Sequence, residues 1–374
     1  VAIQKGAWDQ MIDRVVNFYY GYAQVHNQGY WEDRTLDKAF ALDEQFLNKS
    51  KGIEAVEAVV PRIESFALAA HENFTRGVLV VGTDPEQEDA MTGLRERLVE
   101  GEYLTADDQA VLVGRGITDK MKLQLGDTLV MISQGYRGVN AAGKYPIKGI
   151  VRFGSPELDK QMVYLPLKAA QYFFGAEDLV TTAVINVGKR DKVQPTVKAL
   201  KASLDAEQYE VMEWQEMLPE LVEAREVDTA GNYVVLMVLY VIIGFGIFGT
   251  ILMMTKEREY EFGVLTAIGM NRFKLFVTVW LEIIMLGLLG ALAGIVVSFP
   301  IVYYFNVNPL DFSEMMDGAS EIYEKFGFEP IFPAALDPQI FINQAIIVFI
   351  ITSILAIYPF FKIMKLQPVQ AMRS

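Results

Sequence analysis

Three long runs of the sequence contain almost no charged residues, and they constrain the fold more than any other feature. They cover Tyr233–Thr255, Leu275–Ile301 and Ile340–Phe361, and each is between 22 and 27 residues long. At a rise of 1.5 Å per residue, about 20 helical residues cross a hydrocarbon core of about 30 Å. Helices of soluble proteins are typically about 11 residues long, so three such runs in succession predict three transmembrane helices.

Charged residues around these runs indicate how the chain would cross a membrane. The stretch between the second and third runs, residues 299–339, has one Lys against seven acidic residues, so we expect it to face outward. The connection between the first two runs and the segment after the third run carry basic residues, so we expect both to be cytoplasmic. The basic residues are Lys256, Arg258, Arg272, Lys274, Lys362, Lys365 and Arg373. The part before Tyr233 then lies outside as well. Because the sequence opens without an initiator Met, a basic region or an apolar segment, we expect a first transmembrane helix, or otherwise a signal peptide, to precede it.

The first 230 residues carry charged residues every few positions, which predicts a water-exposed domain. Residues 8–48 are interpreted mainly as helix, because apolar residues such as Met11, Ile12 and Val15 recur at a spacing of three to four. This segment would form a stalk that continues the expected first helix outward.

Beyond the stalk, short runs rich in β-branched residues alternate with helical stretches. The predicted strands are residues 55–60, 78–81, 110–113, 128–132, 145–153, 162–165 and 182–187. The last of these, with a helix over 192–204 and a strand over 210–214, predicts a βαβ element. The predicted fold class is therefore an α-helical membrane bundle, with three spans here and a fourth preceding them, plus a mixed α/β extracytoplasmic domain.

The predicted segments follow one another along the chain without repeats. They are a helical stalk (1–50), an α/β domain (51–229), a first span (230–255), a cytoplasmic connection (256–272), a second span (273–301), an outer loop (302–338), a third span (339–362) and a cytoplasmic tail (363–374).

Composition and motifs exclude several kinds of chemistry. The formal net charge of −14 argues against a nucleic-acid partner, which needs a basic surface. There is no Cys, and His26 and His71 have no second ligand at metal-binding spacing. The sequence also lacks a GxSxG nucleophile elbow and a GxxxxGK[ST] phosphate loop, so we expect no catalysis and no cofactor or metal in this chain. Any ATP-driven work requires a partner that binds ATP and Mg.

Two features lie inside the predicted spans. Residues 244–249 match the dinucleotide fingerprint formally, but they lack the required strand and water, so their glycines are interpreted as helix-packing positions. Residues 290–294 form a second face of small residues. The predicted helix-packing positions on the two faces are Gly246, Gly249, Gly290 and Gly294. Glu282 is the one acidic residue at membrane depth. It either lines a polar path in the bundle or sits near the cytoplasmic end and pairs locally.

The connection between the first two spans resembles a known signature. Residues 256–270, KEREYEFGVLTAIGM, are similar to the ER-x-x-E-[FI]-G-x-L-x-A-[IL]-G signature of FtsX-like permeases, the transmembrane subunits of the MacB and lipoprotein-releasing class of ABC transporters. Residues 366–373, LQPVQAMR, resemble the P-x-x-A-[LM]-R ending of the same family. The layout of the whole chain is similar to that family, and residues 6–12 and 21–29 resemble its lipoprotein-releasing branch. The outer loop, residues 302–338, is long for the family and leaves the subfamily open.

The resemblance implies that residues 256–272 form a coupling helix that docks on a cytoplasmic ATPase. Phe262, Val264 and Leu265 would offer it an apolar face, and Gly263 and Gly269 would permit tight turns at the edges of the helix. The residues assigned to coupling are Glu257, Arg258, Glu261, Phe262, Gly263, Leu265, Gly269 and Met270. The alternative interpretation is a plain cytoplasmic loop anchored by its basic residues.

The implied function is that of a permease subunit of a mechanotransmission-type ABC transporter in the bacterial inner membrane. A second permease subunit, identical or related, and an ATPase dimer would complete it, and ATP hydrolysis would move the periplasmic domain. Lipoprotein release is the first expectation. MacB-like export of peptides or drugs with a periplasmic adaptor, and FtsX-like regulation of a periplasmic cell-wall hydrolase, are the alternatives. Membrane lipid and a periplasmic lipoprotein, chaperone or adaptor are the further partners expected.

Overall fold

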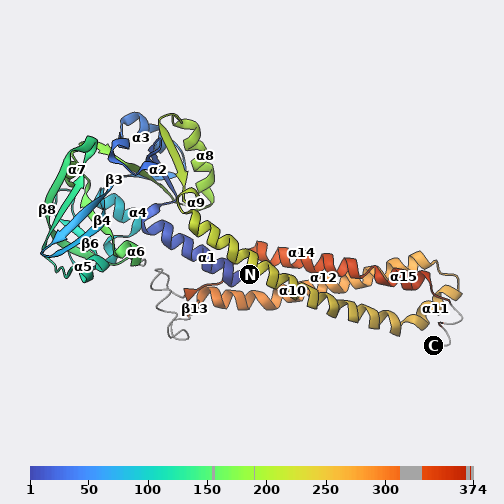
Figure 1. Ribbon diagram of the computed structural model, residues 1–374. Helices are drawn as coiled ribbons and strands as arrows, with labels where there is room; N and C mark the ends of the chain where they lie inside the picture. The colour runs from blue at the N-terminus through green and yellow to red at the C-terminus, as the bar shows by residue number, and fades with distance from the viewer. Residues whose placement is uncertain (154–155, 189, 312–330, 368–370, 372–374) are drawn as a thin grey trace. The chain divides into compact units, whose positions relative to one another are not determined.

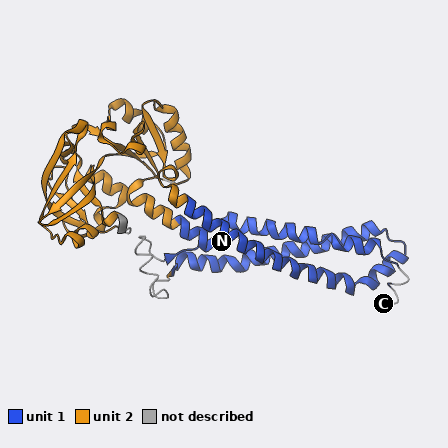
Figure 2. Cartoon of the chain, in the orientation of Figure 1, with its two compact units in different colours: residues 1–9, 223–310, 331–374 blue, residues 10–222, 311–330 orange. Residues whose placement is uncertain are grey.

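The computed structural model describes residues 1–153, 156–188, 190–311, 331–367 and 371. These divide into two compact units (Figure 2). Unit 1 comprises residues 1–9, 223–310 and 331–374, and unit 2 comprises residues 10–222 and 311–330. Most of the acidic outer loop and most of the C-terminal motif lie outside the described residues.

The described part of unit 1 contains three helical segments that are long and apolar enough to cross a membrane (Figure 1). The helices are α10 (Pro219–Glu257), α11 (Glu259–Ala267), α12 (Arg272–Val307), α14 (Pro338–Leu355) and α15 (Tyr358–Met364). Their apolar stretches are mostly exposed within this single chain, as expected for helices that face lipid or other subunits. The three predicted spans are confirmed, and α10 and α12 extend beyond them.

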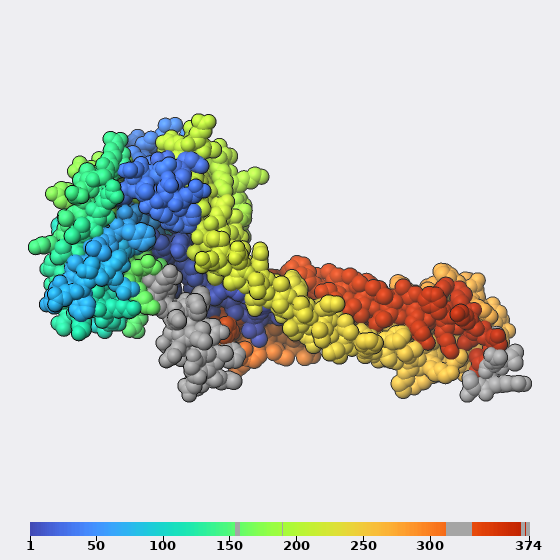
Figure 3. Space-filling view, in the orientation of Figure 1, coloured from blue at the N-terminus to red at the C-terminus, as the bar shows by residue number. Residues whose placement is uncertain are grey.

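Side-chain contacts link the spans and the first residues of the chain. The hydroxyl of Tyr240 on α10 donates to Oε1 of Gln344 on α14, and Figure 3 shows these two helices side by side along one face of unit 1. In the first nine residues, Trp8 Nε1 donates to Oδ2 of Asp228 at 2.6 Å.

Within this chain, the described spans do not pack closely at the four glycines predicted as packing positions, and packing of another subunit's helix there stays a prediction. No described atom outside the local helix lies within 4 Å of where a Cβ would stand at Gly246, Gly249, Gly290 or Gly294. The close approach is instead at Gly287, where a Cβ would lie 2.9 Å from Cγ2 of Thr352 on α14. The prediction took the small-residue spacing as the contact, whereas the helices of this chain meet one turn earlier on α12 and leave an apolar cavity of about 600 Å³ beside the later glycines.

Unit 2 is built on a ten-stranded mixed sheet, in the order β12-β1-β11-β3-β4-β9-β6-β8-β5, with β7 paired to both β3 and β8. Its strands are β1 (Ala23–Asn27), β3 (Val56–His71), β4 (Phe74–Thr83), β5 (Leu98–Gly101), β6 (Val111–Gly114), β7 (Thr128–Gln134), β8 (Asn140–Val151), β9 (Met162–Pro166), β11 (Thr182–Val187) and β12 (Tyr209–Glu213). The short strands β2 (Phe40–Ala41) and β10 (Leu179–Val180) pair separately, as do β13 (Leu310–Asp311) and β14 (Ile331–Phe332).

Helices pack on this sheet or lie at its ends. They are α1 (Ala2–Val15), α2 (Tyr30–Asp33), α3 (Glu44–Lys51), α4 (Pro85–Thr92), α5 (Arg115–Met121), α6 (Pro156–Asp159), α7 (Leu167–Phe174), α8 (Val193–Ser203) and α9 (Trp214–Met217). The mixed α/β domain predicted from the alternating pattern is confirmed.

The long hairpin of β3 and β4 places alternate side chains on opposite faces of the sheet. Ile63, Ala67 and Ala69 point into the main hydrophobic core, which includes side chains from α5 and α7. On the other face, Phe66 and Leu68 are 59% and 49% exposed. Arg62 and Glu64 share that face but are buried, so one end of it is covered and the other is open.

The stalk is shorter than the predicted 1–50. After α1, a π-helical turn η1 (Val16–Tyr20) ends at Gly21, whose φ of +68° favours glycine. Residues 23–27 then form strand β1 instead of helix. Ala23 to His26 are all buried, so no alternation of polar and apolar residues marks the strand in the sequence.

Strand β1 also changes the predicted βαβ unit. The elements β11, α8 and β12 are present, but β1 lies between the two strands and pairs antiparallel with each. The unit is therefore a split βαβ, because the strand that fills its gap comes from the start of the domain.

Within unit 2, the end of α1 and the start of α10 are held together. Ile12 and Val16 pack with Trp214 and Met217 in a buried cluster, and Leu221 of α10 packs against it. The first and last strands of the domain, β1 and β12, lie side by side. The two points at which the chain joins the domain are therefore adjacent.

His26 lies in the core of unit 2 and predicts a pH dependence of its stability. Its Nδ1 lies 3.1 Å from the Thr181 carbonyl oxygen, and its ring stacks on Tyr30. Burial lowers its pKa from 6.5 to about 4, so between these values only the unfolded state binds the proton. The free energy of unfolding should fall by about 3 kcal/mol as pH falls from 7 to 4.

The measurement is the thermal transition of the full chain in nanodiscs, followed by tryptophan fluorescence, and Trp31 and Trp214 of unit 2 are two of the four tryptophans that contribute to it. His26→Phe keeps the ring and removes the titration, so its melting temperature should depend less steeply on pH. Equal slopes for the two proteins would contradict this assignment.

Candidate functional site: the coupling segment

The connection between the first two spans is a short helix between two turns. α10 ends at Glu257 and α11 begins at Glu259. At the far end, Gly269 has a φ of +103°, and the amides of Gly269 and Met270 donate to the Thr266 and Leu265 carbonyls. This is a Schellman cap, for which glycine is the favoured residue. The side chain of Asn271 then accepts from the Phe273 amide and caps α12.

The two predicted turn glycines have different roles. Gly269 makes the turn as the resemblance implied. Gly263 lies in the middle of α11 and is buried, so it makes no turn. In the helix interior a residue without a side chain allows the neighbouring structure to come close.

One face of α11 packs into the bundle. Phe262 is only 2% exposed and lies in a cluster with Ile251 of α10, Leu275 of α12 and Ile363 of α15. Met270 is partly buried against the same cluster. The prediction that Phe262 offers its side chain to a partner therefore does not fit the structure, because this ring already fills a core within the chain.

Ion pairs fix α11 to the ends of the spans. Glu259 is bound by Lys256 of α10 at 2.6 Å and by Lys362 of α15 at 3.3 Å. These two lysines, with Lys256 giving the larger effect, hold the pKa of the Glu259 carboxyl below its usual range. Arg272 of α12 donates to the carbonyls of Met364 and Leu366, and so caps the end of α15.

Glu282 belongs to the same framework. Nη1 of Arg258 lies 2.5 Å from Oε2 of Glu282, and Nε of Arg258 lies 3.0 Å from Oε2 of Glu261. Of the two interpretations left open for Glu282, the structure has the local pair. This carboxylate positions the linker between α10 and α11.

The other face of α11 is exposed. It carries Tyr260, Leu265 and Ile268, which are 57%, 39% and 80% exposed, together with Glu261. Glu257 at the end of α10 is also exposed. Acidic residues around an apolar strip form a surface that a partner protein can recognise, and large exposed apolar side chains away from the spans are typical of interaction sites.

Several of these residues were not identified from the sequence. The sequence indicates Lys362 and Arg272 only as positive-inside charges, and it predicts no separate role for Glu259, Tyr260 or Ile268. The Lys256–Glu259 and Arg258–Glu261 pairs have the three-residue spacing that brings charges together on a helix, which was an available signal. The pairing with Lys362 joins residues about 100 positions apart and had no local signal.

The side chains of the coupling segment serve mainly in packing and ion pairs. Among the described residues, no group of three or more His, Cys, Asp or Glu could hold a metal ion. Four of its charged side chains, Lys256, Arg258, Glu259 and Glu261, are in ion pairs, and its apolar side chains either fill the core or lie exposed.

Two family models match this chain. One, described as the FtsX-like permease C-terminal, matches residues 233–368 and so contains the coupling segment. The other, described as the MacB-like periplasmic core domain, matches residues 2–203.

Two bacterial relatives match at low identity over most of their length. The lipoprotein-releasing system transmembrane protein LolC of Neisseria meningitidis serogroup B (strain ATCC BAA-335 / MC58) is 20% identical over 339 residues, which cover 88% of this chain and 80% of the relative. The protein of the same name from Xylella fastidiosa (strain 9a5c) is 19% identical over 326 residues, covering 85% and 78%.

Two solved structures also match. The periplasmic region of MacB from Actinobacillus actinomycetemcomitans is 14% identical with a TM-score of 0.38, covering 57% of this chain and 98% of that one. The extracellular domain of the noncanonic ABC-type transporter YknZ from Gram-positive bacteria is 16% identical with a TM-score of 0.37, covering 51% and 99%. Because the two family models together span most of the sequence, and one alone matches more than half of it, the chain belongs to the FtsX-like permeases of ABC transporters, with a MacB-like periplasmic core domain.

Proposed function

We propose that this chain is the permease subunit of a mechanotransmission-type ABC transporter and that α11 is its coupling helix. The observation that carries the proposal is the two-sided character of α11. Phe262 and Glu259 tie one side to the spans, while Leu265 and Ile268 remain exposed on the other. A helix braced in this way would pass a push from a docked ATPase to α10, α12 and α15 without bending.

Permease subunits of this family are not themselves catalytic. ATP and Mg would be bound by an ATPase dimer in the cytoplasm, and unit 2 would lie in the periplasm of a bacterium whose inner membrane holds the spans. A second permease subunit, identical or related, would cover part of the exposed span surface. A Cβ at Gly246, Gly249, Gly290 or Gly294 would meet nothing within 4 Å among the described residues, so these positions would be available for that packing.

The relatives favour lipoprotein release as the task of the transporter. Both relatives named above are described as lipoprotein-releasing system proteins, and each matches more than four-fifths of this chain. The MacB-like core domain supports export with a periplasmic adaptor as the second candidate. Copurification from native membranes distinguishes these two candidate functions. Lipoproteins should copurify with a lipoprotein-releasing complex, and an adaptor protein should copurify with an exporter.

The coupling proposal is tested with the double variant Leu265→Ala and Ile268→Ala. Loss of two exposed apolar anchors should weaken binding of the ATPase that copurifies with the wild-type chain by at least about tenfold, with a similar loss of its permease-dependent activity. Both are measured on the complex in nanodiscs, by pull-down and by phosphate release.

The matched control is Leu289→Ala with Leu292→Ala, two exposed apolar residues in the middle of α12. This pair should leave ATPase binding unchanged, because it lies within a span. If the α11 variant binds and stimulates the ATPase as well as the wild type does, α11 is only an anchored loop and the coupling proposal fails.

A further inference from the structure

A small cavity lies inside unit 2, at the covered end of the outer sheet face. Its volume is about 300 Å³, at the lower end of the range for small-molecule sites. Tyr19 of η1, Tyr30 of α2, Glu64 and Phe66 of β3 line it, and Arg34 stands beside them. All these residues belong to unit 2, so the cavity is independent of the spans.

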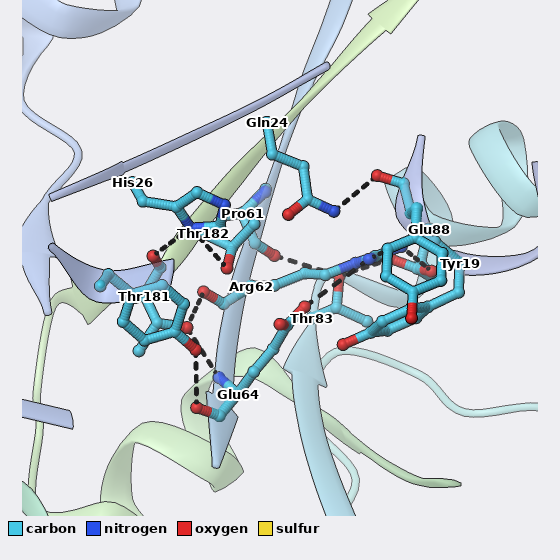
Figure 4. A network of polar contacts seen from close by, with 12 residues as sticks. Tyr19, Gln24, His26, Pro61, Arg62, Glu64, Thr83, Glu88, Thr181 and Thr182 are labelled. Atoms are coloured by element: carbon cyan, nitrogen blue, oxygen red, sulfur yellow. Dashed lines mark hydrogen bonds and ion pairs between the residues drawn. The ribbon is translucent and has the colours of Figure 1, made fainter. Parts of the chain in front are cut away.

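The charges beneath the cavity do not balance. Arg62 is fully buried and binds Glu88 twice, through Nε to Oε2 at 2.9 Å and through Nη2 to Oε1 at 2.6 Å. Its Nη1 donates to the Tyr19 carbonyl at 2.6 Å and lies 3.6 Å from Oε1 of Glu64. One buried guanidinium therefore serves two buried carboxylates, and its contact with Glu64 is the long one (Figure 4). The Tyr19 side chain and the exposed Arg34 are the other groups that favour the charged form of Glu64.

Two polar atoms at the cavity lack a partner. Oε1 of Glu64 and the hydroxyl of Tyr19 are buried and make no hydrogen bond to any described residue. More than about 90% of buried polar groups in proteins have one. A carboxylate accepts only, so the missing group is a donor, and the excess negative charge favours a cationic donor such as a primary ammonium.

A second charge stands beside the cavity. The guanidinium of Arg34 lies 3.4 Å from the centre of the Trp31 ring, and its Nε donates to the Trp31 carbonyl. Its two terminal nitrogens make no hydrogen bond to a described residue. Arg34 also has a φ of +50°, which is rare for a residue with a side chain and is often kept at functional sites. These nitrogens can bind a carboxylate or a phosphate group.

We propose that this cavity binds a small zwitterion, with its primary ammonium on Glu64 and Tyr19 and its anionic group on Arg34. The rings of Tyr30 and Phe66 offer apolar walls to the part between the two charges. A free α-amino acid and a phosphoethanolamine group both have this chemistry. The proposal goes beyond the transport function and does not rest on it.

Binding would also act on the stalk within unit 2. Tyr19 belongs to η1, the π-helical turn that ends α1, and such turns often mark functional positions. A ligand that engages the Tyr19 hydroxyl would hold this turn in place, so that occupancy of the cavity would change how firmly the end of α1 is fixed.

The test is calorimetric binding to the full chain in nanodiscs of a lipid without primary amines. The probes are the common L-amino acids and O-phosphoethanolamine, each at millimolar concentration. We expect at least one probe to bind. Whether it is an amino acid or O-phosphoethanolamine distinguishes the two possible sources of the zwitterion. The N-acetylated form of the bound probe, which lacks the ammonium, should bind at least about tenfold more weakly.

Three variants test whether the ligand binds in this cavity. Glu64→Gln, Tyr19→Phe and Arg34→Asn should each weaken binding, with Glu64→Gln giving a loss of at least about tenfold. Arg34 is exposed and asparagine tolerates its backbone conformation, so this variant keeps the test decisive if a buried one fails to fold. The controls are Glu54→Gln and Arg152→Gln, exposed residues of unit 2 that should bind as the wild type does.

Two results would overturn the proposal. One is that no probe binds the wild-type chain. The other is that the folded Glu64 and Arg34 variants bind with unchanged affinity. A further readout separates a binding role from a structural one. Burial raises the pKa of the Glu64 carboxyl, so Glu64→Gln should raise the melting temperature of the ligand-free protein while it weakens binding.

Discussion

Replacing Arg62 with methionine should lower the free energy of unfolding of unit 2 by about 3–5 kcal/mol, the typical cost of breaking a buried ion pair from one side. Arg62 and Glu88 are both fully buried, and Glu64 lies beside them. Without the guanidinium, two carboxylates remain in the protein interior and lose their buried counterion, and the Tyr19 carbonyl loses its donor. The loss of stability should therefore affect β3, α4 and the stalk together.

Hydrogen exchange of the full chain, read by mass spectrometry, can follow this loss in β3 and β4 separately from the spans. Exchange of their protected amides should become at least about 100-fold faster in Arg62→Met. The double variant Arg62→Met and Glu88→Gln removes one stranded charge and should recover part of the loss. If the single variant exchanges as slowly as the wild type, the buried cluster does not hold the domain together.

Replacing Phe262 with alanine should destabilise the end of the bundle that carries α11 by about 3–5 kcal/mol, as for other buried phenylalanines. The ring lies in a core shared by α10, α12 and α15, and its removal leaves a cavity between them. Amides of α11 and of the first turns of α12 should exchange faster in the variant, with or without a bound ATPase.

The matched comparison is Leu265→Ala, three residues further along the same helix and exposed. It should leave exchange in the bundle unchanged and affect only the contact with the ATPase. If Phe262→Ala left the exchange of α11 and α12 unaltered and reduced only ATPase binding, Phe262 would be a docking residue, as the sequence resemblance first suggested.

The spans and the mixed α/β domain could be predicted because their signals are local. A run such as Leu275–Ile301 needs nothing but its own length and composition to indicate a transmembrane helix. Strand β1 could not be predicted, because residues 23–26 are buried on both faces and follow an amphipathic helix without a polar break. What makes them a strand is the gap between β11 and β12, which lie more than 150 residues away.

Prediction of the coupling segment is likewise limited to features with a local sequence signal. The sequence located the segment and its cap at Gly269, since cap and turn chemistry are local. It assigned Phe262 to the wrong side of the helix, because a short helix with apolar residues on both faces does not indicate which face meets the bundle. The choice is made by Ile251 and Ile363, which belong to the first and the last of the three spans and are more than 100 residues apart in sequence.

The adjacency of β1 and β12, together with the cluster of Ile12, Val16, Trp214 and Met217, gives the periplasmic-type domain the form of an insertion. About two hundred residues lie between the two neighbouring points at which α1 and α10 join this domain, as in domains that tolerate being grafted into a host protein. Exchange of this insert between related permeases would keep the spans and α11 unchanged while the sheet domain is replaced. Recombination at two sites is then enough to combine one membrane bundle with different sheet domains.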